Sequence, residues 1–309
     1  MLSRTADCLF WLGRYTERAA NVARGLSVTL RMASLSSELG AELDAWRSLL
    51  VASGCAPGFD AKHAETTQEN VVDFLVRDPD NLSGIIPCFA AARHNARTVR
   101  TALTVDMWGA LNDTWNQIRA AEFQGEKLPG FLEWVRERVL LFNGAAQDTM
   151  LRGEPWLFVQ LGTALERADN TARLLDVKHD LLGPGSQGTV AYGQWQAILQ
   201  SVSALRAYHW VYRDRLEARR IAELLILRPE LPRSLVACFG RVLEVLERIA
   251  AGQGGRRGEC HRLAGELHAR LAYGRIGDIL EGGLHAFLTD MIGRTARLGA
   301  EIEAFYIRP

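Results

Sequence analysis

This sequence is poor in the features that mark several large classes of protein. Its 36 Lys and Arg residues balance 36 Asp and Glu residues, so no net field attracts nucleic acid or an anionic membrane surface. No apolar run reaches the roughly 20 residues that a membrane-spanning helix needs. The N-terminal region also lacks the apolar core of a signal peptide. We therefore expect a cytoplasmic protein that binds neither nucleic acid nor membrane.

Cysteine and histidine are both scarce. The five cysteines are odd in number, widely spaced and without a C-x-x-C pair, which argues against a disulfide framework and a zinc ribbon. His261 and His268 share a helical face, but seven residues is too long a spacing for one metal ion without a ligand from elsewhere. The remaining candidate ligands stand alone in the sequence: His179, His209 and His285. The sequence predicts no metal site and no cofactor.

Helical periodicity dominates what is present. Hydrophobic residues make up 48% of the 309 residues, enough for a sizeable core, and they recur at helical spacing with no convincing β pattern. The pattern predicts a long first helix, from Ser3 or Thr5 to about Ser37. Further predicted helices span residues 42–53, 67–76, 82–103, 106–123, 131–151 and 284–306. The fold class expected is all-α.

The chain also repeats itself. The segment from Leu12 to Arg24 follows the pattern L-G-x-x-x-E-R-A-x-N-x-A-R, which returns without a gap from Leu161 to Arg173, 149 residues later. A period this long indicates duplication of a multi-helix unit rather than a short-repeat solenoid. We expect a helical bundle of two fused pseudo-symmetric repeats, residues 1–150 and 151–309, that pack as one compact body.

The polar residues of the repeated segment are the first candidates for a functional site. On a helix they fall on one side: Arg14, Glu17, Asn21 and Arg24 in the first copy, and Glu166, Asn170 and Arg173 in the second. Arg18 and Arg167 complete the two Glu-Arg pairs. These residues could form a solvated face, in which Glu17 and Arg24 are too far apart to pair directly. Alternatively the two stripes are buried and face each other or a shared cavity, where the charges must be paired.

A cationic stripe in the fourth predicted helix is the second candidate. Arg93, Arg97 and Arg100 stand at i, i+4 and i+7 with Asn95 near the edge, whereas the aligned positions of the second half carry Leu, Glu and Ala. Three guanidinium groups on one face repel one another unless acidic side chains or a bound anion neutralise their charge. The stripe either pairs with a motif glutamate or binds a peptide carboxylate, a phosphate or an acidic partner surface.

At this point the chain resembles a known family. The opening segment, Leu2 to Ala19, is similar to the start of the bacterial alpha-E family, an all-helical domain named for its Glu-Arg motif. Similar segments continue over nearly the whole chain: Asp78 to Asn81, Ala92 to Arg97, Trp108 with Asn112, the second Leu-Gly-x3-Glu-Arg-Ala, and Leu231 to Ser234. The family pattern has Pro and Ser where Leu82 and Gly84 stand, so we expect the capping of that turn to differ. The resemblance implies two partners, an ATP-grasp amide ligase and a transglutaminase-like peptidase.

Two functions remain open from the sequence. The residues favour a non-catalytic binding or scaffold protein with a polar cleft between the Glu-Arg helices. With the resemblance, this becomes a partner of an ATP-grasp amide-ligase and transglutaminase-like peptidase system acting on peptides or small amines. The alternative is an enzyme in which Glu17 or Glu166 performs acid/base chemistry while the arginines bind an anionic substrate. A buried glutamate with a raised pKa would favour the enzyme, and fully paired glutamates would favour the scaffold.

Overall fold

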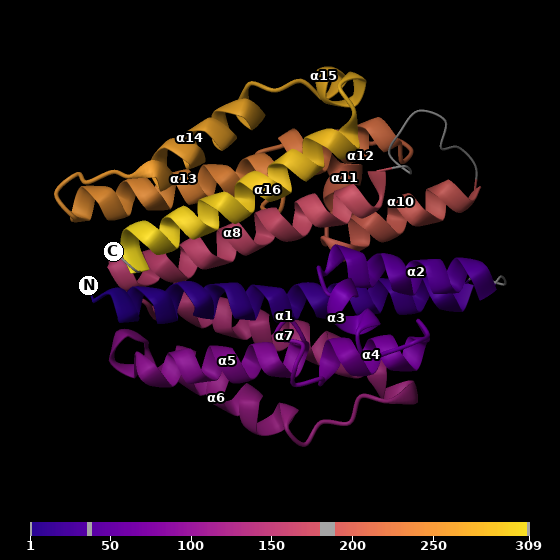
Figure 1. Ribbon diagram of the computed structural model, residues 1–309, viewed down its shortest axis with the longest axis horizontal. Helices are drawn as coiled ribbons and strands as arrows, with labels where there is room; N and C mark the ends of the chain where they lie inside the picture. Colours follow the sequence, from indigo (N-terminus) through magenta and orange to yellow (C-terminus); the bar gives the residue numbers. More distant parts are fainter. Residues whose placement is uncertain (1, 36–38, 180–188, 308–309) are drawn as a thin grey trace. The chain divides into compact units, whose positions relative to one another are not determined.

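The computed structural model describes residues 2–35, 39–179 and 189–307. All regular elements in these ranges are helical and no strand occurs among them, which confirms the all-α class (Figure 1). No helix in the described ranges combines the length and apolar character needed to cross a bilayer. The chain divides into two compact units, Met1–Thr163 and Ala164–Pro309. Duplication of one ancestral unit stays a prediction.

The first unit is built around one long helix. Its elements are α1 (Ser3–Leu35), α2 (Leu39–Ala52), α3 (Ala56–Asp60), α4 (Gln68–Val76), α5 (Ile85–Thr98), η1 (Arg100–Ala102), α6 (Val105–Ile118), η2 (Gly125–Lys127), α7 (Leu128–Thr149) and the start of α8 (Glu154–Val177). Helix α1 packs against α5 and α7, and α6 packs against the same two helices, so these four form a bundle. Leu9, Leu12 and Leu26 of α1 are fully buried in it.

The second unit contains the rest of α8 and a comparable series of helices. These are α10 (Thr189–Ser201), α11 (Leu205–Tyr212), α12 (Ala218–Leu227), α13 (Leu235–Gly252), α14 (Glu259–Ala272), α15 (Ile276–Glu281), α16 (Leu284–Ile302) and the π-helical turn η3 (Glu303–Ile307). Helix α14 packs against both α13 and α16. Val242, Val245 and Leu246 of α13 supply part of the buried core.

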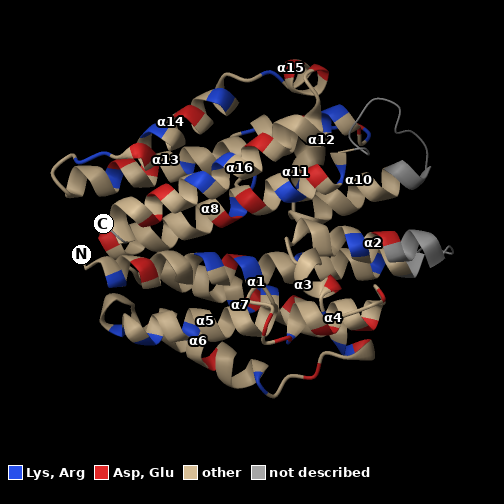
Figure 2. Cartoon of the chain, viewed as in Figure 1, with Lys and Arg blue, Asp and Glu red and all other residues tan. Residues whose placement is uncertain are grey.

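Charges of both signs are scattered over the helices of each unit (Figure 2). In the second unit they form an ion-pair network between α14 and α16. Its links join Glu259 with Arg262 and Arg297, Glu266 with Arg262 and Arg294, and Asp290 with Arg270 and Arg294. Because these side chains are largely exposed, each pair adds little alone, and the network chiefly fixes how the two helices align.

The turns that precede α5 and α13 confirm the expected difference in capping. Ser234 precedes α13, and its hydroxyl oxygen accepts a hydrogen bond from the Ala237 amide at 3.2 Å. Gly84 occupies the matching position before α5 and provides no side-chain cap. In the first unit Asn81 orders the turn instead: its amide group donates to the Phe74 carbonyl at 2.9 Å and its oxygen accepts from the Ser83 amide at 3.2 Å.

The helix boundaries differ from expectation at several ends. The helices expected over residues 82–103 and 106–123 are shorter, because α5 ends at Thr98 and α6 at Ile118, and α7 begins earlier than expected. The sequence placed Leu128 and Pro129 in a break before a helix beginning at Phe131, whereas α7 begins at Leu128 with Pro129 in its first turn. Proline is compatible with this position because the first amides of a helix have no carbonyl partner within the helix. The expected end of the first helix near Ser37 lies outside the described residues, because α1 is described to Leu35.

The closest backbone approach in the first unit lies where α1 meets the start of α8. A methyl group added to Gly13 would overlap the Val159 carbonyl oxygen and lie 3.0 Å from the Thr163 amide nitrogen. A methyl group added to Gly162 would overlap the Phe10 carbonyl oxygen and lie 3.2 Å from the Arg14 amide nitrogen. Val159 and Thr163 stand 149 residues after Phe10 and Arg14, the offset that also separates the glycines. The contact is therefore reciprocal, and glycine is required on both helices.

We expect Gly13→Ala and Gly162→Ala each to lower the free energy of unfolding by about 3 kcal/mol, because the new methyl group meets backbone atoms that cannot rotate away. Urea unfolding would measure the loss. Gly109→Ala is the matched control, since no atom lies within 4 Å of the added methyl group in α6. It should raise stability by up to about 1 kcal/mol, as alanine favours a helix interior. Equal behaviour of all three variants would contradict the close contact.

A buried histidine fixes the start of α14. The Gly258 amide donates to His261 Nδ1 at 3.1 Å, so this nitrogen bears no proton and Nε2 carries it. Nε2 lies 3.1 Å from the Tyr306 hydroxyl, which it can use as an acceptor. Burial lowers the pKa of His261 below its ordinary value. Protonation of Nδ1 would remove the acceptor that the Gly258 amide uses.

This arrangement predicts a loss of stability in mild acid. The pKa of His261 is lower in the folded chain than in the unfolded chain, where it is about 6.5, so the unfolded chain binds the proton first as the pH falls. The contribution of His261 is complete above pH 6.5 and declines below it. In His261→Asn, whose amide oxygen can replace Nδ1 as acceptor, the pH dependence of the unfolding free energy should be shallower between pH 7 and pH 5. The exposed control His94→Asn should keep the wild-type slope; identical slopes in all three proteins would contradict the assignment.

Candidate functional site

The first Glu-Arg segment is buried rather than solvated. Glu17 is 1% exposed, and its Oε1 lies 3.1 Å from Nη2 of Arg24, whose side chain is 8% exposed. The solvated-face interpretation is therefore wrong for this glutamate. The expectation that Glu17 and Arg24 cannot pair directly is also wrong.

Helix geometry explains this pairing. Seven residues turn through almost two full turns, so the two side chains project from the same face, and they rise about 10 Å along the axis. A long side chain on a helix leans back toward the N-terminus. Extended arginine and glutamate side chains together can span this distance. The usual ion-pair spacings on a helix are three and four residues, so a spacing of seven was not expected to allow a direct pair. Arg24 therefore neutralises the buried Glu17 carboxylate from within the same helix.

The neighbours of this pair have separate contacts. Arg18 donates to the Ser83 hydroxyl at 3.5 Å, in the turn before α5, so the two residues of the Glu-Arg pair point in different directions. The Arg14 guanidinium lies 4.7 Å from the Trp11 ring centre and 5.7 Å from that of Phe10. Asn21 is half-buried. Of the four polar residues of the first stripe, Glu17 and Arg24 pair with each other, while the Arg14 guanidinium lies against aromatic rings.

The second copy has a different arrangement. Glu166 is 1% exposed, like its counterpart, and Arg167 is half-buried. Arg173 pairs with Asp169 at 2.8 Å, one turn away on α8. The amide nitrogen of Asn170 is buried and, among the described residues, has no hydrogen-bond partner. Contacts across a symmetry axis between the two stripes stay a prediction.

The cationic stripe forms a real surface feature of the first unit. Arg93 donates from Nε to the Asn112 amide oxygen at 3.1 Å, and its guanidinium lies 5.9 Å from the Trp108 ring centre. The Arg100 guanidinium lies 4.7 Å from the same ring. Arg97 is exposed, and Asn95 is half-buried. We call Arg93, Arg97, Arg100 and Trp108 the arginine face.

No acid neutralises the arginine face in the described part of the chain. None of its three arginines forms an ion pair there, and Arg93 bonds to an amide rather than to a motif glutamate. Of the two interpretations offered for the stripe, internal pairing with a Glu-Arg glutamate is therefore wrong. Trp108 supports two of the guanidinium groups by cation–π contact, which holds them in place without cancelling their charge.

A cysteine and a histidine meet in the second unit without forming an activated pair. Cys260 Sγ lies 3.4 Å from His261 Nδ1. Burial raises the pKa of the Cys260 thiol to about 11, so the thiol stays protonated near neutral pH. The nucleophile of cysteine enzymes is the thiolate. His261 is also engaged by Gly258 and Tyr306, which fits a structural role for this pair.

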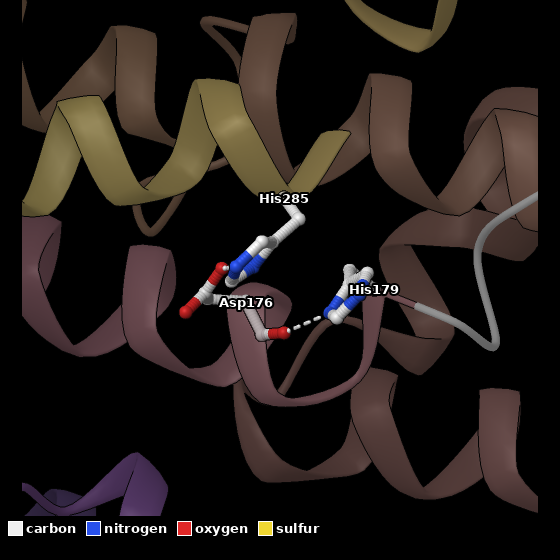
Figure 3. Close-up of side chains that lie close together, drawn as sticks. All are labelled: Asp176, His179 and His285. Carbon is white, nitrogen blue, oxygen red and sulfur yellow. Dashed lines mark hydrogen bonds and ion pairs between the residues drawn. The ribbon is translucent and has the colours of Figure 1, made fainter. Parts of the chain in front are cut away.

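Two histidines that look isolated in the sequence lie together in the structure. The rings of His179 and His285 are stacked with centres 4.5 Å apart and planes at 28° (Figure 3). Asp176 lies beside both: its Oδ1 is 2.7 Å from His285 Nδ1, and its backbone oxygen is 2.6 Å from His179 Nδ1. The expectation that these histidines are isolated is therefore wrong. No local pattern indicates this contact, because 109 residues separate Asp176 from His285.

The comparison with known families agrees with the motif geometry. A family model for Alpha-E, described as an alpha-helical domain with a conserved ER motif, matches residues 1–307. The chain belongs to the Alpha-E family. Glu17 with Arg18 and Glu166 with Arg167 are the two Glu-Arg pairs of this chain, so the feature in the family's description coincides with its two buried motif glutamates.

The curated relatives that match this chain are longer than it is. Uncharacterized proteins of Mycobacterium bovis and Mycobacterium tuberculosis are each 25% identical to this chain over 328 aligned residues. The alignments cover 94% of this chain but 35% of each relative, so the chain spans about a third of their length. No solved structure matches.

The buried pair predicts a large cost for removing either partner. Glu17→Ala and Arg24→Ala should each lower the free energy of unfolding by about 3 kcal/mol, because each leaves a buried charge without its partner. The double variant should lose less than the sum of the two. Urea unfolding of the four proteins closes the cycle. Asp73→Ala, which breaks the exposed pair of Asp73 with Arg77, is the control and should cost less than about 1 kcal/mol. Additive losses at positions 17 and 24 would show that the two groups do not interact.

Proposed function

We propose that this chain is a non-catalytic partner of an ATP-grasp amide ligase that works with a transglutaminase-like peptidase on peptides or small amines. The partner identities rest on the resemblance to the alpha-E family. The arginine face is the surface that binds an acidic region of the ligase. The proposal depends chiefly on one observation: Arg97 and Arg100 are exposed and form no ion pair within the described residues.

The arginine face has the composition of a protein-binding surface. Arginine and tryptophan are the residues that most often dominate binding energy at interfaces. Trp108 and Asn112 hold Arg93 and Arg100 in defined positions, which reduces the entropy that binding must overcome. A carboxylate on a partner could accept two parallel hydrogen bonds from either exposed guanidinium.

The buried charges of the Glu-Arg segments also support the proposal of a non-catalytic role. Glu17 pairs with Arg24 inside the first unit. A carboxylate committed to a buried pair positions a helix. The longer relatives add a second argument, because an Alpha-E region within a larger chain is placed next to further polypeptide.

Light scattering behind gel filtration tests the proposal. This chain and the ATP-grasp amide ligase of the same organism would be run separately and mixed, with and without ATP. We expect a joint peak whose mass is the sum of the two. Arg97→Ala combined with Arg100→Ala should weaken binding at least about 10-fold, because close charge pairs at interfaces couple by more than 1 kcal/mol.

Arg119→Ala is the matched control for this experiment. Arg119 is an exposed arginine of the first unit that lies 5.8 Å from the ring centre of Trp115, a setting like that of Arg100 beside Trp108. Its loss should leave the joint peak unchanged. If the double variant still forms the complex, the arginine face is not the binding surface. A failure to form any joint peak would contradict the partner role itself.

A further inference from the structure

The C-terminal end of α8 and the N-terminal end of α16 bring together three side chains with metal-ligand chemistry (Figure 3). We propose that Asp176, His179 and His285 form a binding site for a divalent transition-metal ion such as Zn²⁺. The proposal does not depend on the arginine face or on the partner role, because all three residues belong to the second unit.

The three side chains converge closely enough for one ion. One ligand atom from each residue can be chosen so that all three lie within 4.8 Å of one another. Ligands about 2.0 to 2.1 Å from a tetrahedral Zn²⁺ stand about 3.3 Å apart. The groups must therefore approach by roughly 1.5 Å at most. Rotation about the side-chain bonds can supply this movement, because the His285 side chain is 60% exposed.

Hydrogen bonding already selects a metal-binding form of His179. Its Nδ1 lies 2.6 Å from the backbone oxygen of Asp176, and an oxygen of this kind can only accept. Nδ1 therefore carries the proton, and Nε2 is the ring nitrogen whose lone pair can bind a metal ion. Histidines that bind metals characteristically donate their other N–H to a backbone carbonyl or a carboxylate in this way.

Asp176 contributes in two ways. Its backbone oxygen orients His179, and its carboxylate lies 2.7 Å from His285 Nδ1. The carboxylate neutralises part of the positive charge of a divalent cation. It also keeps the His285 ring close to that of His179. Two imidazoles with one carboxylate form a borderline nitrogen and oxygen donor set, which suits zinc better than magnesium or calcium.

The surroundings allow an ion to enter. His285 is exposed at the start of α16, and the Asp176 side chain keeps 22% of its surface accessible. Three protein ligands leave a fourth tetrahedral position, which water or an anionic ligand would fill. His261, another histidine of this unit, is buried and has both ring nitrogens engaged.

Zn²⁺ titration of the full chain, with any affinity tag removed, tests the site by competition with a coloured chelator. Wild type should bind one equivalent, and Co²⁺ should give the intense visible bands of a low-coordinate site. His179→Ala and His285→Ala should weaken binding at least about 10-fold, and Asp176→Asn should do so while preserving the shape of the side chain. His209→Ala is the control, because His209 is an exposed histidine of the same unit outside the cluster.

Unfolding curves of the metal-free proteins keep the test independent of folding. All variants should unfold like wild type without zinc, and zinc should raise the melting temperature of wild type and His209→Ala but not that of His285→Ala. Wild-type affinity in the three cluster variants would overturn the proposal. So would an equal loss of affinity in His209→Ala, or the absence of stoichiometric binding by wild type.

Discussion

The close backbone contact between α1 and the first turns of α8 is the constraint on which the first unit depends. Gly13 and Gly162 each face backbone atoms of the opposite helix with no room for a methyl group. Such a contact fixes the two helices in register, because any sliding brings a residue with a Cβ atom against a carbonyl oxygen. The glycines open the two repeated segments, and each buried motif glutamate stands four residues further along its own helix.

Burial of a carboxylate in each repeated segment imposes a second requirement. Removing one from water costs several kcal/mol unless a cation and hydrogen bonds replace the lost solvation. In the first unit Arg24 pairs with Glu17 along the same helix. In the second unit Arg173 pairs with Asp169, a position where the first copy has Ala20. The same motif is thus embedded in two different networks. A charge held in this way fixes the position of the helix that carries it.

The two units differ more in their surface residues than in their series of helices. Helix α5 carries the arginine face, but the corresponding positions of α13 hold Leu243, Glu247 and Ala250, and Ala250 is fully buried. The second unit instead has the ion-pair network of α14 and α16 and the cluster formed by Asp176 with two histidines. Each unit therefore offers a different ligand chemistry on a comparable set of helices, and a function of the chain can use the two separately.

The sequence by itself determined the helical class, most helix positions, the Alpha-E membership and the altered cap at Gly84, because periodicity, caps and motifs are local properties. It also singled out Arg93, Arg97 and Arg100, since their spacing alone places them on one face. Only the tertiary structure decided which charged side chains have a partner of opposite charge. The pairing of Glu17 with Arg24 depended on how deeply the helix is buried. The meeting of Asp176 with His285 depended on packing between residues 109 positions apart in the chain. Long-range packing leaves no trace in local spacing, so the contact of Asp176 with His285 could not be predicted from the sequence.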